Sequence, residues 1–192
     1  RRRVVLAIPN VGVALFTRDG GAGHLVRGPE EEDVGPVDQR HQGQDIAGLG
    51  LLDHGRQQEA EELGYKTQPY VVIVGGGQGG IALGARLRRL GVPTIIIEKN
   101  ERPGDSWRKR YKSLCLHDPV WYDHLPYLPF PDDWPVFSPK DKIGDWLEMY
   151  TKVMELNYWG STECKSASYD EKTGEWTVNV VREGKPVTLK PK

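Results

Sequence analysis

The chain has 192 residues, of which 38% are hydrophobic and 28% charged, and its 26 Lys and Arg nearly balance its 27 Asp and Glu. This balance excludes a nucleic-acid binder driven by electrostatics and a polybasic membrane module, because both need a strongly basic surface. Two cysteines are too few for a disulfide scaffold, and no apolar run reaches the roughly 18 residues that span a bilayer, so we expect a soluble, cytoplasmic protein of undetermined oligomeric state.

Residues 1–58 differ in composition from the rest of the chain. They hold ten glycines but no Lys, Ser, Tyr, Trp, Cys or Met, and Phe16 is their only aromatic residue. Such a segment has few side chains to bury and cannot offset its ordering entropy. We interpret residues 1–64 as a disordered or non-native N-terminal segment and residues 65–192 as a domain. Because the chain begins with Arg1 rather than Met, we expect it to be part of a longer protein.

The first 16 residues combine three arginines with a moderately apolar stretch, as secretory signals do. A proline, an asparagine and a glycine interrupt that stretch, and no small-residue cleavage site follows Phe16. A short strand or a disordered tail is therefore favoured over a signal peptide.

The sequence of residues 55–100 predicts a helix, a strand, a second helix and a second strand in succession. Helix-forming residues at 55–63 predict a short solvated helix. Residues 70–74 form a continuous apolar run rich in β-branched residues, which is typical of an interior strand of a parallel sheet. A glycine-rich turn follows, then a helix that stops at Gly91 and a strand over 93–100, which together predict a βαβ unit. The apolar positions of that second helix are Ile81, Leu83, Leu87 and Leu90.

Three glycines of this unit, Gly75, Gly77 and Gly80, match the pattern G-x-G-x-x-G. Gly75 permits a tight turn after the strand, Gly77 lets the backbone approach a pyrophosphate, and Gly80 lets the helix lie close to the sheet. The N–H groups at the start of the helix, near Gln78 and Gly79, then face a diphosphate at the positive end of the helix dipole. The pattern predicts an adenine-dinucleotide site, with a glycine-rich loop that binds nothing as the alternative.

An acidic residue follows at the distance that such a site requires. Glu98 closes the second strand, 18 residues after Gly80, where its carboxylate can accept hydrogen bonds from both hydroxyls of an adenosine ribose. The same charge would repel a ribose 2′-phosphate, so the site disfavours NADP. Gly84 adds another small residue on the helix. The agreement of strand, glycines, helix and acid is more specific than the glycine pattern alone.

The residues after Glu98 resemble the flavin-containing monooxygenase family, including its plant auxin-synthesising branch. In that family the ribose-binding glutamate is followed by a G-G-x-W motif and by a stretch that passes under the flavin. The matching residues here are Gly104, Asp105, Ser106 and Trp107, then Tyr111, Leu114, Leu116, His117 and Pro119. Asp105 replaces the second glycine of the motif. The likeness covers residues 70–192 and is most specific over 75–119.

This resemblance implies that the chain binds FAD. The implied cofactor-binding residues are Gly75, Gly77, Gln78, Gly79, Gly80, Glu98, Lys99, Ser106, Trp107, Leu116 and His117. His117 falls where many family members place an asparagine beside the flavin and the nicotinamide. The resemblance therefore gives it a catalytic role, as a hydrogen-bond partner of the flavin or of its C4a-hydroperoxide, whereas an ordinary loop histidine is the alternative. A metal site of Cys115, His117 and His124 lacks a recognisable ligand motif, and we predict none.

The remaining residues predict a loop, a helix and a β-meander. Six prolines in 119–139 prevent a regular helix or central strand, and the aromatic residues there predict a loop packed on a surface, as a structural element or over the substrate side. A proline-rich ligand for a partner is less favoured, because large aromatic side chains prefer burial. Ser138 as N-cap before Pro139 predicts a helix to about residue 156. Its apolar stripe comprises Ile143, Trp146, Leu147, Tyr150, Val153 and Met154. Residues 163–190 predict two or three antiparallel strands.

These elements predict an α/β fold: a truncated Rossmann-like, FAD-binding βαβ unit of the glutathione-reductase type with an antiparallel β-meander, behind a disordered N-terminal segment. The resemblance implies the FAD-binding portion of an NADPH-dependent flavin monooxygenase, which oxygenates a small organic substrate with O₂. The family's second glycine pattern, which holds NADPH, is absent from residues 1–192. The alternatives are a non-catalytic dinucleotide-binding remnant and an NAD-dependent oxidoreductase, and the latter does not explain the motif at residues 104–107.

Overall fold

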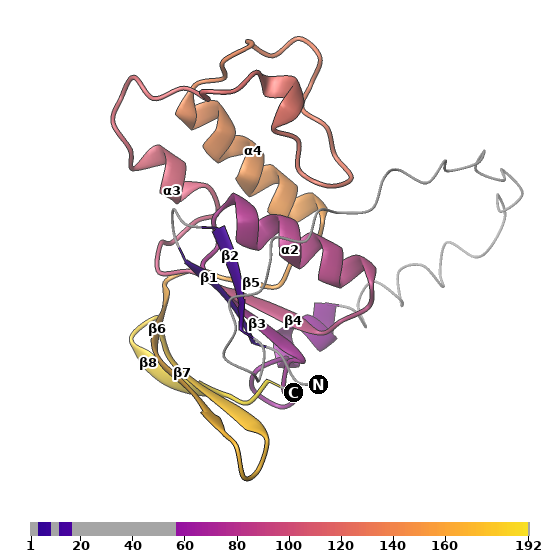
Figure 1. Ribbon diagram of the computed structural model, residues 1–192, viewed down its shortest axis with the longest axis vertical. Helices are drawn as coiled ribbons and strands as arrows, with labels where there is room; N and C mark the ends of the chain where they lie inside the picture. The colour runs from indigo at the N-terminus through magenta and orange to yellow at the C-terminus, as the bar shows by residue number, and fades with distance from the viewer. Residues whose placement is uncertain (1–3, 9–11, 17–56, 192) are drawn as a thin grey trace, which may run out of the picture.

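The computed structural model describes residues 4–8, 12–16 and 57–191 of the chain (Figure 1). Five strands form one sheet in the order β2-β1-β3-β4-β5. They are β1 (Val4–Ile8), β2 (Gly12–Phe16), β3 (Val71–Val74), β4 (Thr94–Ile97) and β5 (Tyr158–Trp159). All neighbouring pairs are parallel except β1 and β2, which form an antiparallel pair. The first 16 residues thus contain two strands, whereas residues 17–56, most of the segment expected to be disordered, lie outside the described residues.

The predicted βαβ unit is formed by β3, α2 (Gln78–Arg89) and β4. Both faces of its strands are covered, which explains why both strands are apolar except at Thr94. On one face Val71, Ile73 and Ile96 pack against Leu83 and Leu87 of α2. On the other face Val72, Ile95 and Ile97 pack against the second sheet. The arrangement is therefore a parallel sheet between a helical layer and a β layer.

The helix α2 ends as predicted, because Gly91 follows it with a φ of +67°. Its buried face consists of Gly80, Ile81, Gly84 and Ala85. Leu90 was expected on that face, but its side chain is 74% exposed because the helix ends at Arg89. The short helix predicted over 55–63 is present at residues 57–62. No helix in the described part of the chain is long and apolar enough to cross a membrane.

The predicted meander is a second, antiparallel sheet in the order β6-β7-β8 (Figure 1, yellow). Its strands are β6 (Thr162–Asp170), β7 (Glu175–Arg182) and β8 (Lys185–Leu189). The period-two alternation of β7 places Val178 and Val180 in the core, where they pack with Leu189 and the outer face of the parallel sheet. Together these layers confirm the predicted α/β fold class.

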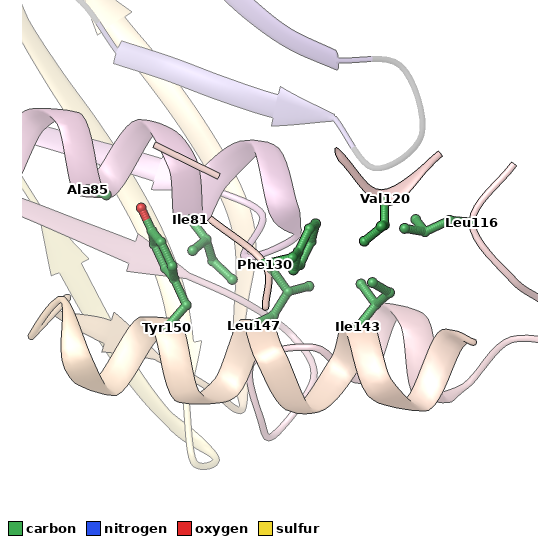
Figure 2. Close-up of a cluster of buried hydrophobic side chains, with 8 residues drawn as sticks. All are labelled: Ile81, Ala85, Leu116, Val120, Phe130, Ile143, Leu147 and Tyr150. Carbon is green, nitrogen blue, oxygen red and sulfur yellow. The ribbon is translucent and has the colours of Figure 1, made fainter. Parts of the chain in front are cut away.

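A third group of buried side chains joins α2 to α4 (Lys140–Val153), as Figure 2 shows. Ile81 and Ala85 of α2 face Ile143, Leu147 and Tyr150 of α4. The proline-rich loop adds Val120, from the 3₁₀ turn η1 (Val120–Tyr122), and Phe130 to the same cluster. The loop is therefore packed against the helices through Val120 and Phe130. Its aromatic residues are buried only in part, because Trp121, Tyr122, Tyr127 and Phe137 are exposed.

Both ends of α4 differ from the prediction. Ser138 Oγ donates to the carbonyl oxygen of Pro135 at 3.0 Å and does not cap the helix, which begins at Lys140 after Pro139. The helix ends at Val153, three residues before the predicted Leu156, and the Val153 side chain is 59% exposed. The alternative hydrogen bond of the serine explains the first error, since Ser side chains bind nearby backbone carbonyls as readily as helix N–H groups.

The short helix α3 (Asp105–Arg108) sits against α4 at a glycine contact. Gly104 has a φ of +86°, and a Cβ on it would lie 2.1 Å from the carbonyl oxygen of Gly144 in α4. Arg108 extends the contact, because its guanidinium pairs with Asp145 and Glu148 of α4. The first glycine of the G-G-x-W-like motif thus has a packing role between two helices.

Candidate dinucleotide-binding site

The loop between β3 and α2 turns sharply where the glycine pattern begins. Gly75 has a φ of +108°, and its N–H donates to the carbonyl oxygen of Ile97 at 2.8 Å, at the carboxyl end of β4. A Cβ on Gly80 would lie 2.0 Å from the carbonyl oxygen of Gly75. The first turn of α2 therefore contacts the loop backbone directly, and this approach requires glycine at position 80.

Glu98 lies directly beside this loop. Its carboxylate is 8% exposed, and Oε2 accepts the N–H of Gly76 at 2.8 Å. Oε1 accepts the backbone N–H of Asn100 at 2.9 Å and its side-chain amide at 2.7 Å. Three donors therefore fix the carboxylate at the loop, and the two oxygens retain acceptor capacity for a ligand hydroxyl.

The N-terminus of α2 offers donors to an anion. Gly77 is the N-cap, with extended backbone, and the first turn of the helix contains no acidic residue. The three basic residues of α2 lie in its last turn. No described side chain caps the start of α2, so the orphan N–H groups of its first turn lie at the positive end of the helix dipole, where an anion is favoured.

Ser106 adds a hydroxyl group at the same place. Its Oγ lies 4.0 Å from the position of a Cβ on Gly77. The oxygen is buried, and within the described part of the chain no hydrogen-bond partner reaches it. A buried hydroxyl without a partner is costly, and an anionic oxygen bound at the loop would satisfy it. The residues present therefore fit a bound diphosphate.

The motif tryptophan connects the loop to a cavity. Trp107 Nε1 donates to Oε1 of Gln78 at 2.9 Å, so α3 and the start of α2 are linked. A cavity of about 710 Å³ opens beside this pair, and Gly79, Leu116 and His117 also line it. Five of the predicted site residues thus line one cavity, whereas Gly75, Gly77, Gly80, Glu98 and Ser106 form the adjoining loop region.

The remaining cavity wall carries titratable groups from the proline-rich loop. Burial raises the pKa of Asp123 above its ordinary value, and the nearby Asp118 adds to the shift. His124 Nδ1 accepts the backbone N–H of Phe130 at 3.0 Å, so this histidine holds the loop. His117 is exposed at the wall, and Lys99 is exposed beside Glu98 but does not line the cavity.

Three residues of the site lie outside the predicted set: Gly76, Asn100 and Tyr158. Gly76 occupies a variable position of the glycine pattern, and its burial depends on partners distant in sequence. Asn100 lies two residues beyond Glu98, and both its backbone N–H and its side-chain amide donate to Glu98 Oε1. Tyr158 had no local signal, since it reaches the loop from β5, 82 residues later.

Comparisons with known sequences match the part of the chain that contains this site. A family model described as NAD(P)-binding Rossmann-like domain matches residues 73–128, from β3 through the cavity wall. The probable indole-3-pyruvate monooxygenase YUCCA9 of Arabidopsis thaliana is 36% identical over 114 residues, which are 59% of this chain and 27% of that protein. YUCCA3 of the same plant is 39% identical over 111 residues, 57% of this chain and 25% of that protein. An uncharacterized CzcO-like oxidoreductase of Geobacillus kaustophilus is 35% identical over 109 residues, 57% of this chain and 31% of that protein.

Solved structures share the fold. A flavin-containing monooxygenase from Stenotrophomonas maltophilia has a TM-score of 0.56 at 24% identity, covering 64% of this chain and 36% of that chain. OTEMO, solved with FAD and NADP, has a TM-score of 0.54 at 22% identity, covering 63% of this chain and 24% of that chain. The sequence matches confirm the resemblance to flavin-containing monooxygenases indicated by residues 75–119. The chain spans about a quarter of the length of the plant relatives it matches.

Proposed function

We propose that this chain, a relative of the flavin monooxygenases over about 110 residues, is the FAD-binding portion of such an enzyme. The observation that carries the proposal is the hydrogen bond between Gly76 N–H and the buried Glu98 carboxylate. It holds Glu98, the candidate ribose-binding acid, against the loop that would bind the diphosphate. Beside them lies the Ser106 hydroxyl, which has no hydrogen-bond partner among the residues that the structure describes. That combination suits the adenosine and diphosphate of one ligand.

Each part of the site has a role in this proposal. The N–H groups of Gly77 and of residues 78–80 would bind the diphosphate, with Ser106 as a further donor. Glu98 would accept the ribose hydroxyls. The cavity beside Trp107, Leu116 and His117 would hold the far end of the cofactor and shield it from water. His117 would supply a hydrogen bond at the cavity wall.

The bound FAD would supply the redox chemistry of an NADPH-dependent oxygenation of a small organic substrate, with O₂ as the oxidant. The residues of this chain would bind and orient the flavin. The reductive and oxygenating steps are proposed for the whole protein, in a cytoplasmic location. Because seven plant relatives are named for indole-3-pyruvate, that compound is the first substrate to assay on the whole protein.

The proposal predicts that the 192-residue chain binds FAD in a saturable, one-to-one manner. The measurement is a titration of flavin fluorescence, with ADP as a competitor because it shares the adenosine and the diphosphate. Displacement of FAD by ADP is expected. A chain that binds NAD but leaves FAD free would instead support the NAD-dependent oxidoreductase.

Measurement of enzymatic turnover distinguishes an active monooxygenase from a non-catalytic dinucleotide-binding remnant. We expect NADPH oxidation that depends on added FAD in the whole protein. The same activity in the 192-residue chain would eliminate the interpretation of this chain as a non-catalytic remnant.

A further inference from the structure

Tyr158 contacts the glycine loop although it lies on another strand. It belongs to β5, and its hydroxyl donates to the carbonyl oxygen of Gly76 at 3.1 Å. A Cβ on Gly76 would lie 2.3 Å from that hydroxyl oxygen and 2.5 Å from the ring carbon Cζ. The tip of the tyrosine ring therefore fills the space that a side chain at position 76 would need.

Both polar groups of Gly76 are bonded to residues outside the loop. Its carbonyl accepts from Tyr158, and its N–H donates to Glu98. The two partners are neighbours on the sheet, because β4 pairs with β5 and Glu98 N–H donates to the carbonyl oxygen of Trp159 at 2.9 Å. The sheet edge thus fixes the loop at two consecutive peptide groups.

This arrangement determines the direction of the next donor. In a planar trans peptide the C=O and the N–H point in opposite directions. When the carbonyl of Gly76 points at Tyr158, the N–H of Gly77, the N-cap of α2, must point away from the tyrosine. Glycines have little conformational restriction of their own, so an external anchor is required to hold this orientation.

We infer that Tyr158 is a positioning residue that orients the Gly77 N–H toward a bound diphosphate. The inference rests on the proposed dinucleotide site and adds to it the determinant of its loop conformation. Burial, with the charges of Glu98 and Asp105 nearby, raises the pKa of Tyr158 well above its usual range. The hydroxyl consequently remains protonated and able to donate at neutral and alkaline pH.

The test compares Tyr158→Phe with the unsubstituted 192-residue chain, using ADP and adenosine as probes. The variant keeps the ring but leaves the buried Gly76 carbonyl without its donor. We expect its dissociation constant for ADP to rise roughly three- to tenfold, as for the loss of one neutral hydrogen bond. The constant for adenosine, which has no phosphate, should stay the same. Tyr169→Phe, in β6 of the other sheet, is the matched control and should leave both unchanged.

An unchanged ADP affinity in Tyr158→Phe would overturn the inference. Equal weakening of ADP and adenosine would also overturn it, because that result indicates a general structural role. A chain that binds neither ADP nor FAD would overturn the inference and the proposed function together. Binding of ADP without FAD would refute only the FAD proposal, since the comparison at Tyr158 depends on ADP.

A second pair of variants tests the steric contact. Gly76→Ala should weaken ADP binding more than Tyr158→Phe does, because the new Cβ overlaps the tyrosine ring. Tyr158→Ala removes that overlap, so the double variant should bind ADP no more weakly than Tyr158→Ala alone. The contact would be contradicted if the loss of ADP affinity in the double variant equalled the sum of the losses in the two single variants. Substitutions of residues that touch are expected to have non-additive effects.

Discussion

Replacing Gly80 with alanine is expected to weaken the binding of ADP and FAD more than any other substitution considered for this loop. The new Cβ would lie 2.0 Å from the carbonyl oxygen of Gly75, and a backbone atom cannot move aside without displacing the loop. Displacing the loop removes at least two hydrogen bonds to a charged ligand, each worth about 1.5–3 kcal/mol, so affinity should fall roughly a hundredfold or more. Isothermal titration with ADP measures this loss.

Gly84 provides the matched control within the same helix. A Cβ there would lie 2.5 Å from Cδ1 of Ile96, which is the end of a side chain and lies on the sheet side of α2. Gly84→Ala should therefore cost about 1–3 kcal/mol of unfolding free energy through overpacking but leave ADP affinity within about twofold. Equal losses of ADP affinity in both variants would contradict the assignment of the ligand to the loop.

Replacing Glu98 with glutamine is expected to weaken ADP binding roughly ten- to a hundredfold. The carboxylate accepts three hydrogen bonds, from the Gly76 N–H and from the two amide groups of Asn100. A glutamine has one acceptor oxygen, so its NH₂ group must face one of these donors. The lost charged hydrogen bond is worth about 1.5–3 kcal/mol. Glu101→Gln, an exposed neighbour three residues later, is the control and should have no effect on ADP binding.

The same substitution should change the selectivity of the site. NAD and NADP differ only by the 2′-phosphate, which the charge of Glu98 would repel if Glu98 binds the ribose. We expect the chain to bind NAD in preference to NADP, and Glu98→Gln to reduce that preference about fivefold or more, as for removal of a repulsion of about 1 kcal/mol. The measurement is displacement of bound FAD by each dinucleotide. If Glu98→Gln left the ratio of the NAD affinity to the NADP affinity unchanged, Glu98 would not be the residue that contacts the ribose.

The sequence predicted the βαβ unit and the meander because their local signals agree with their tertiary surroundings. Apart from Thr94, the residues of β3 and β4 are apolar, and the structure covers both faces of these strands. The glycine pattern fixed the place of the turn, since Gly75 has a positive φ and Gly80 touches the backbone. In β7 the alternation at Val178 and Val180 showed which side chains face the core.

The errors in the predicted helix ends have two causes. A capping side chain found another hydrogen-bond partner, or the helix ended before its apolar spacing did. Serine commonly caps helices, but the hydroxyl of Ser138 donates instead to the carbonyl oxygen of Pro135. Leu90 and Val153 continue the helical spacing of their segments, yet each lies at or beyond the last helical turn and is exposed. Helix boundaries are set by tertiary contacts as well as by spacing, so periodicity alone places them only approximately.

The candidate site was only partly predictable for a related reason. Residues 75–80 and Glu98 belong to one βαβ unit, so their proximity follows from the topology of that unit. The contact of Tyr158 with Gly76 depends on the pairing of β4 with β5, which lies across a long stretch of chain. The cavity beside Trp107 similarly requires the proline-rich loop to pack on α4. Neither arrangement has a local sequence pattern.

The central claim, that a diphosphate binds at the start of α2, is tested most directly by locating bound ADP on the 192-residue chain. In amide ¹H–¹⁵N spectra recorded during an ADP titration, the account predicts the largest shifts at residues 76–80 and at Asn100. A second cavity of about 450 Å³, lined by Val92 and Leu156, lies elsewhere on the molecule. Shifts concentrated around that cavity, with residues 76–80 unaffected, would contradict the account.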